Sequence, residues 1–182
     1  MEIESTSLSG LMIIKPKIFK DERGFFLESY HRSRFYEAGI ECDFVQDNHS
    51  LSARGTLRGL HYQSSPGQAK LVRCTRGSIW DLAVDLRLDS PTLGKFWAIE
   101  LNDENHFQFF IPVGFAHGFY VLSEKAEVQY KCSAVYNAQT EAGVAWDDPD
   151  LNLPWPDKKP LLSERDKKNP TFKDFLKLST NT

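Results

Sequence analysis

The 182-residue sequence has few cysteines, and their pattern excludes two kinds of protein. Cys42, Cys74 and Cys132 are odd in number, widely spaced and without a C-x-x-C pair. Such spacing argues against a disulfide framework and against a zinc site. It fits buried thiols in a reducing compartment, so we expect a cytoplasmic protein.

The sequence also lacks a long hydrophobic run and a strong charge of either sign. The longest apolar stretch, 109–122, is interrupted by proline, glycine and histidine and falls short of the roughly 20 residues that a bilayer-spanning helix needs. The N-terminus shows no basic region followed by an apolar one, so no secretory signal is visible. A formal net charge of -3 gives no general affinity for nucleic acid or anionic membrane. We therefore expect neither as a partner.

Three common catalytic motifs are missing. The chain has no G-x-G-x-x-G, no Walker-type phosphate loop and no G-x-S-x-G elbow. Nicotinamide chemistry, P-loop phosphoryl transfer and the usual serine hydrolase are therefore poorly supported. Acid–base chemistry and metal chemistry remain as the enzymatic options.

The apolar residues indicate an all-β domain. From residue 11 to 144 they form short runs separated by turn signals, which is typical of a sandwich or jelly roll. Two segments alternate clearly, so that each can pack a core with one face and line a wet cavity with the other. They are SIWDLAVDLR at 78–87, where Trp80, Leu82, Val84 and Leu86 share one face, and EVQYKC at 127–132, where Val128, Tyr130 and Cys132 share one.

Two short helices are predicted at the periphery. Residues 33–38 form the first, with Gly39 placed to end it. In the second, near the C-terminus, Asn169 can cap and Pro170 suits the first helical position. We interpret residues 1–182 as a single domain, with a barrel core at about 11–145 and a C-terminal loop and helix at about 146–182.

Two histidine segments raise the question of a metal. IPVGFAHGF, 111–119, contains P-x-G-x-x-H, the form of the second signature of the cupin barrels. Many cupins bind a metal through this histidine and through an H-x-H pair with a glutamate on the first signature. The corresponding stretch here, RGLHYQ at 58–63, has His61 and no second imidazole. Ligand count therefore argues against a metal. A metal-dependent oxygenase or isomerase that uses His61 and His117 stays an alternative.

Several segments, in order along most of the chain, resemble the dTDP-4-dehydrorhamnose 3,5-epimerase family. They are DERGFF at 21–26, QDN at 46–48, RGLHYQ at 58–63, QAKLV at 68–72, GFAHGF at 114–119, YKCSAVY at 130–136 and LSERD at 162–166. The resemblance implies a cupin-type jelly roll that epimerises a dTDP-4-keto-6-deoxyhexose at both carbons flanking the ketone, without metal or redox cofactor. It also implies a step toward dTDP-L-rhamnose, and a homodimer in which N-terminal strands cross between subunits.

The resemblance assigns roles to individual residues. It implies that His61 is the base, paired with Asp166, that Tyr130 is the acid on the other face of the sugar, and that Lys70 is the cation beside the keto oxygen. Tyr136 falls where the family stacks the thymine ring, and Arg165 stands where the family usually has lysine. The other expected substrate contacts are Arg23, Glu28, Gln46, Asp47, Asn48, Arg58, His117 and Glu141.

The chemistry asks for the same residue types. Loss of a proton beside a ketone gives an enolate, whose negative oxygen an ammonium stabilises. An imidazole with a pKa of ~6.5 is a suitable base near neutral pH, and a carboxylate can fix its tautomer. Inversion needs reprotonation from the opposite face, for which a phenol is a reasonable donor. A diphosphate favours guanidinium groups such as Arg23 and Arg58, and a thymine favours an aromatic face.

Other interpretations stay open at this point. Taken singly, Lys70 could be a solvated strand residue, Tyr130 a core aromatic and Asp166 part of a solvated charged run. Strict strand alternation would turn Arg58 away from His61 unless a bulge at Gly59 bends the chain. The functional alternatives are an epimerase that acts at one carbon and a non-catalytic sugar-nucleotide binder.

Overall fold

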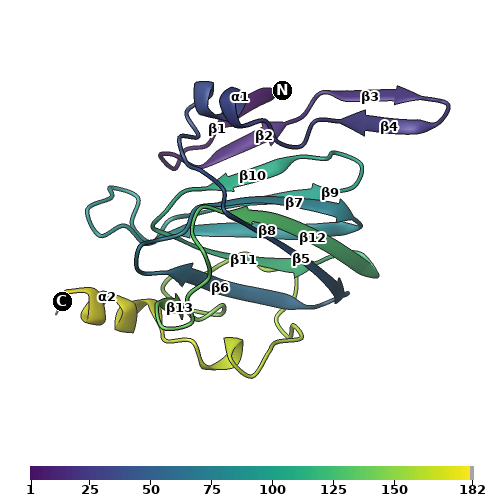
Figure 1. Cartoon of the computed structure of the whole chain (residues 1–182). Coiled ribbons are helices and arrows are strands. Elements are labelled where there is room, and N and C mark those ends of the chain that lie inside the picture. Colours follow the sequence, from purple (N-terminus) through teal and green to yellow (C-terminus); the bar gives the residue numbers. More distant parts are fainter. Residues whose placement is uncertain (181–182) are drawn as a thin grey trace.

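The protein is built mainly from two antiparallel sheets that pack face to face, and its computed structural model describes residues 1–180 (Figure 1). The six-stranded sheet contains, in spatial order, β1 (Glu2–Ser5), β2 (Met12–Lys15), β10 (Gln108–Ile111), β7 (Lys70–Arg76), β12 (Lys125–Cys132) and β5 (Gln46–Ala53). The five-stranded sheet contains β13 (Glu141–Gly143), β6 (Leu57–Gln63), β11 (Phe115–Val121), β8 (Ser78–Asp85) and β9 (Phe96–Asn102). The predicted all-β, cupin-type jelly roll with short peripheral helices is confirmed.

The main hydrophobic core lies between the two sheets. Its members come from both of them, and include Val72 and Val128 on the six-stranded sheet and Ile79 and Phe119 on the five-stranded sheet. In β12, Val128 and Cys132 are fully buried while Glu127 and Gln129 are only partly covered, as the alternating sequence predicts. Every second residue of this strand therefore points into the barrel.

Strand β8 is covered on both of its faces. Ile79 and Ala83 point into the main core, whereas Leu82 and Val84 pack on the outside of the sheet. The residues that cover this outer face come mainly from the C-terminal segment, which runs along that side of the barrel (Figure 1). The apolar face of β8 thus has its own small core, separate from the barrel interior.

The helices are short and peripheral, and the second begins later than the sequence predicts. Helix α1 (Arg32–Glu37) ends just before Gly39, which has φ +90°. Helix α2 (Phe172–Thr180) follows the 3-10 turn η1 (Asp166–Lys168). The predicted cap at Asn169 is wrong: Thr171 Oγ1 accepts a hydrogen bond from the backbone N–H of Asp174, at 3.2 Å, and caps α2. The last two residues of the predicted C-terminal segment, 181 and 182, lie outside the described residues.

A bulge in β6 turns Arg58 and His61 toward the same side. His117 of β11 pairs with His61, but Phe119, two residues on, pairs with Arg58, three residues back. One extra residue is therefore accommodated in β6. Gly59 has φ +141°, and a Cβ at this position would lie 2.6 Å from the Cα of Gly118. The predicted bulge at Gly59 is confirmed, and a glycine is required there.

A hairpin of β3 (Ile18–Asp21) and β4 (Gly24–Leu27) projects away from the barrel (Figure 1). It carries three largely exposed phenylalanines, Phe19, Phe25 and Phe26. All three cysteines are free thiols, of which Cys74 and Cys132 are buried, as predicted, and Cys42 is only partly buried. No helix within residues 1–180 is long and apolar enough to cross a membrane.

Candidate active site

A cavity of about 510 Å³ opens into the barrel between the two sheets. Strands of both sheets and the C-terminal segment line it. Its polar lining residues are Ser50, Thr56, Arg58, His61, Lys70, His117, Tyr130, Glu141, Ser163, Arg165 and Asp166, and its apolar ones are Leu57, Phe119, Leu161 and Leu162. The cavity therefore collects all four residues that the sequence analysis placed in the chemistry.

His61 and Asp166 form a close pair at the wall of this cavity. His61 Nε2 lies 2.5 Å from Asp166 Oδ1, and the Asp166 side chain is only 4% exposed. Although burial opposes ionisation, hydrogen bonds from His61 and Ser163 lower the pKa of Asp166 below its usual value. An ionised carboxylate can only accept a hydrogen bond, so Nε2 of His61 is the donor. In the neutral ring, Nδ1 is then the nitrogen that can accept a proton.

Lys70 brings an ammonium group into the barrel from β7. The residue is 9% exposed, and its Nζ donates a hydrogen bond to the backbone carbonyl of His61, at 3.3 Å. Burial lowers the pKa of Lys70, while Cys132, Glu141 and Asp81 act in the opposite direction. The amine of Lys70 therefore lies beside the base, at the wall of the cavity.

Tyr130 enters the cavity from the sheet opposite His61. It lies on β12 of the six-stranded sheet, whereas His61 lies on β6 of the five-stranded sheet. Burial raises the pKa of Tyr130, so its hydroxyl keeps its proton well beyond neutral pH. A proton acceptor and a proton donor thus line facing walls of one cavity.

His117 is paired with a carboxylate that the sequence analysis did not single out. His117 Nε2 lies 2.9 Å from Asp81 Oδ1, and both side chains are buried. The alternation of β8 already placed Asp81 on its polar face. No pattern in the sequence indicates that β8 and β11 bring this residue opposite the cupin-signature histidine.

Four of the predicted substrate contacts meet at one end of the cavity. Glu141 accepts hydrogen bonds from Arg165, at 2.6 Å, and from the hydroxyl of Tyr136, at 2.7 Å. The backbone N–H of Tyr136 donates to Gln46 Oε1, at 2.8 Å. The Tyr136 ring is largely exposed, so its face is available to a ligand. Charged groups and an aromatic ring are thus held together at this end.

Two further predicted contacts lie on the inner side of the barrel wall. Arg58 lines the cavity, and its Nε donates to Ser52 Oγ, at 3.0 Å. Asn48 is half-buried on β5 opposite Tyr130, and donates a weak hydrogen bond to the Cys132 thiol. Both residues are therefore within the same part of the barrel as Tyr130.

Asp47 does not join this group. Because successive residues of β5 alternate between faces, Asp47 points away from the cavity while Gln46 and Asn48 point inward. Asp47 forms an ion pair with Lys131, at 2.9 Å, on the outside of the six-stranded sheet. Its side chain therefore does not line the inner cavity of its own chain, and its expected contact with the substrate stays a prediction.

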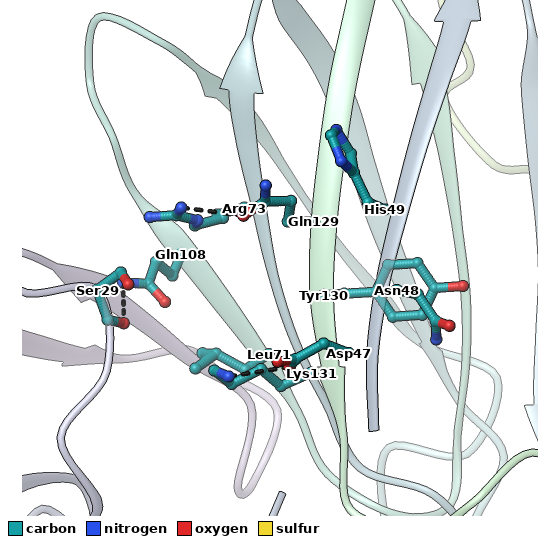
Figure 2. Close-up of a pocket in the computed structure, with 10 residues that line it drawn as sticks. All are labelled: Ser29, Asp47, Asn48, His49, Leu71, Arg73, Gln108, Gln129, Tyr130 and Lys131. Atoms are coloured by element: carbon teal, nitrogen blue, oxygen red, sulfur yellow. Dashed lines mark hydrogen bonds and ion pairs between the residues drawn. The ribbon is translucent and has the colours of Figure 1, made fainter. Parts of the chain in front are cut away.

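The outer surface around Asp47 holds a second, smaller cavity of about 290 Å³. Figure 2 shows that Tyr130 and Asn48 point away from Arg73, Gln129 and Lys131, which occupy the other side of these strands. Arg73 donates to Gln129, at 3.0 Å, so these outer groups are paired with one another. His49 also lines this outer cavity and pairs with Glu127, at 3.2 Å. His61, Lys70 and Asp166 line only the inner cavity, so we assign the chemistry to that one.

Arg23 and Glu28 also lie away from the inner cavity. Arg23 is exposed on the β3–β4 hairpin and binds Asp21, at 2.5 Å, while Glu28 binds Arg34, at 2.7 Å. The hairpin projects from the opposite end of the molecule to the C-terminal segment that carries Asp166 (Figure 1). The structure of a single chain therefore does not bring these two residues to the site.

The histidines that line the cavity are not arranged as a metal centre. Within residues 1–180, no group of three or more histidine, cysteine, aspartate or glutamate side chains is arranged to hold a metal ion. His61 and His117 are each already bonded to a carboxylate through Nε2.

Comparisons with known proteins agree on one family. Residues 5–174 match the family described as dTDP-4-dehydrorhamnose 3,5-epimerase. The enzyme of that name from Shigella flexneri is 49% identical over 176 residues, which cover 96% of this chain and 97% of the relative. The dTDP-4-dehydrorhamnose 3-epimerase of Streptomyces niveus is 41% identical over 168 residues, covering 91% of this chain and 81% of the relative.

A solved structure shows the same fold. The crystal structure of dTDP-6-deoxy-D-glucose-3,5-epimerase from Legionella pneumophila Philadelphia 1, in complex with dTDP-4-keto-L-rhamnose, superposes with a TM-score of 0.91. It is 48% identical in sequence, and the match covers 93% of this chain and 92% of that one.

Proposed function

Because the chain belongs to the dTDP-4-dehydrorhamnose 3,5-epimerase family, we propose that it converts dTDP-4-dehydro-6-deoxy-D-glucose to dTDP-4-dehydro-L-rhamnose. The protein is accordingly an isomerase that acts on a sugar nucleotide. The reaction inverts carbons 3 and 5 on either side of the keto group and is a step toward dTDP-L-rhamnose. It needs only proton transfers, so no cofactor is required.

The observation that carries this proposal is the arrangement of three groups in one cavity. His61 and Tyr130 come from opposite sheets, and Lys70 lies beside His61. Inversion requires that a proton leaves one face of the sugar ring and another arrives on the opposite face. Facing walls that carry a base and an acid meet this requirement.

The steps follow from the chemistry of each group. Nδ1 of His61 removes the proton from carbon 3 or carbon 5, and the electron pair of the broken C–H bond forms an enolate with its negative charge on oxygen 4. The Lys70 ammonium stabilises that charge. The Tyr130 hydroxyl then delivers a proton to the same carbon from the other face. Exchange with solvent returns the proton to Tyr130 and removes one from His61.

Asp166 supports the base throughout the reaction. Its ionised carboxylate accepts the Nε2 hydrogen of His61 and stabilises the imidazolium that forms after proton abstraction. The low pKa of Asp166 keeps that charge in place at neutral pH.

The nucleotide is recognised by the end of the cavity where Tyr136, Glu141 and Arg165 meet. Guanidinium groups bind phosphate oxygens in a planar, bidentate manner, which suits Arg165 and Arg58 to the diphosphate. The exposed ring of Tyr136 suits a thymine face. Lysine at position 165 would keep the charge and lose the bidentate geometry.

We also propose that the protein is a homodimer, in which the hairpin of one subunit reaches the cavity of the other. Two observations support this. Arg23 and Glu28 lie far from the cavity of their own chain, and the hairpin exposes Phe19, Phe25 and Phe26. An exposed apolar group of this kind favours a protein partner. The three free thiols and the sugar-nucleotide substrate support a cytoplasmic location.

The deciding experiment is incubation of enzyme and substrate in heavy water. Deuterium should appear at both carbon 3 and carbon 5, as read by NMR of the product. Label at carbon 3 alone would support the second candidate, an epimerase that acts at one carbon, which the similarity to the Streptomyces niveus 3-epimerase favours. Binding of dTDP without any exchange would indicate a non-catalytic binder. Loss of activity after dialysis against a chelator, restored by metal, would indicate a metal-dependent enzyme.

A further inference from the structure

Asp81 is a buried carboxylate that the reaction described above does not use. It lies on β8 and is fully buried within the barrel. Its Oδ1 accepts a hydrogen bond from His117 Nε2, at 2.9 Å, while its Oδ2 has no hydrogen-bond partner among residues 1–180. A buried carboxylate with a free oxygen is costly to maintain, so its place next to the active-site cavity calls for an explanation.

Lys70 lies in the same part of the barrel. It lines the cavity together with His117, the partner of Asp81, and its Nζ bonds to the carbonyl of His61, the β6 residue opposite His117. Burial raises the pKa of Asp81, and both His117 and Lys70 act to lower it. Burial lowers the pKa of Lys70, and Asp81 is one of three groups that act to raise it. The two side chains lie on opposite sheets, and their opposite charges favour each other's ionised form.

The other two groups are less suited to balance the Lys70 charge. Burial raises the pKa of the Cys132 thiol, which is therefore neutral near pH 7. Glu141 is already ion-paired with Arg165, at 2.6 Å, and bonded to Tyr136. The remaining titratable groups around this space are Arg58, His61, His117, Tyr130 and Asp166, of which Asp166 is bonded to His61. Asp81 is thus the carboxylate with an uncommitted oxygen.

We propose that Asp81 is a positioning residue of the epimerase, which orients His117 through one oxygen and holds Lys70 in its ammonium form through the charge on the carboxylate. The inference rests on the proposed function, because an ammonium is needed only where an enolate oxygen develops. Without a counter-charge, a lysine enclosed by the barrel would lose its proton readily. Asp81 keeps the cation available without touching the substrate.

The test is the isosteric variant Asp81→Asn. Its amide oxygen can still accept from His117, so the hydrogen bond is kept and the charge is lost. The alkaline midpoint of kcat against pH should fall by about one pH unit or more, because removal of a nearby opposite charge lowers the pKa of the lysine. KM should change little, since the nucleotide binds elsewhere in the cavity. ¹⁵N NMR of the lysine Nζ groups, assigned with Lys70→Met, should show the same downward shift in the Lys70 titration.

Two further variants make the outcome decisive. Asp89→Asn makes the same chemical change at an exposed position and should leave both titrations unchanged. In a Lys70→Met background, Asp81→Asn should cause no further fall in kcat. An unshifted Lys70 titration in folded Asp81→Asn, shown by its circular dichroism, would overturn the inference. The NMR titration does not depend on turnover, so it separates this result from failure of the wild-type enzyme to exchange carbons 3 and 5.

Discussion

His61 Nε2 lies 2.5 Å from Asp166 Oδ1, although 105 residues separate the two in the sequence. The contact forms because the C-terminal segment returns to the edge of the barrel, where backbone hydrogen bonds join Leu161 to Leu57, at 3.0 Å, and to Gly55, at 2.8 Å. The orientation of the proposed base therefore depends on a segment outside the two sheets.

Replacing the base should remove most of the activity. We expect His61→Asn to lower kcat by about 100-fold to 10,000-fold, the usual contribution of a general base. Deuterium incorporation at carbons 3 and 5 should fall with it, while dTDP still binds in a calorimetric titration. Retention of fast exchange at either carbon would assign the base for that carbon to another residue.

Replacing the proposed acid should affect the two halves of the reaction unequally. In Tyr130→Phe we expect proton removal to continue, because His61 and Lys70 are intact, and inversion to slow. NMR in heavy water can compare the rate of label uptake with the rate of epimer formation. Since burial raises the pKa of Tyr130 above its usual value, the wild-type donor should stay protonated throughout the neutral pH range. Equal loss of exchange and inversion would contradict a donor-only role.

A shared active site can be tested by complementation. If Arg23 acts in the partner's cavity, Arg23→Ala and His61→Asn homodimers should each be weak, since each lacks one group in both sites. Mixed dimers contain one site with both native residues and should recover up to about half of the wild-type activity per dimer. Kinetic assay after unfolding and refolding the two variants together measures this. Each variant refolded alone is the control, and additive low activity would contradict the shared site.

The β8–β9 connection should contribute to stability in a pH-dependent way. The buried Asp85 carboxylate accepts hydrogen bonds from Arg87, at 2.7 and 2.8 Å, from Ser90, at 2.6 Å, and from Thr92, at 2.7 Å. These bonds lower the pKa of Asp85 to about 2 although burial opposes them. We expect Asp85→Asn to reduce the free energy of unfolding by about 2–3 kcal/mol at pH 7, measured in urea.

The sign of the pH effect follows from that low pKa. Because the folded-state pKa lies below the ordinary value of 3.8, the stabilisation is complete above about pH 4 and is lost as the pH falls toward 2. The difference between wild type and Asp85→Asn should therefore shrink over this range. Asp89→Asn, at an exposed position of the β8–β9 connection, is the matched control. A difference that stays constant down to pH 2 would show that charge is not its cause.

Local patterns in the sequence were enough to predict the strands and one irregularity, the bulge in β6. Alternation predicted which residues of β12 point inward, and Gly59 indicated the bulge that brings Arg58 and His61 to one side. The same rule explains why Asp47 lies outside the inner cavity of its own chain although Gln46 and Asn48 point inward, because adjacent strand residues face opposite ways.

Long-range relationships were beyond the sequence alone. The pairing of Asp81 with His117 depends on how β8 and β11 are aligned, and the position of Arg23 depends on where the hairpin projects. The start of α2 was missed because Asn169 and Thr171 are both good caps and only packing decides between them. The single-domain organisation of residues 1–182 and the individual site roles stay predictions.

The C-terminal segment packs on the outer face of β8 and also carries Asp166, the partner of His61. The same stretch of chain therefore completes a small hydrophobic core and orients the proposed base. Elements at the edge of a domain open more readily than central strands do. As the temperature rises, turnover should therefore fall before the barrel unfolds. Detachment of the C-terminal segment removes Asp166 from His61 while the two sheets stay folded.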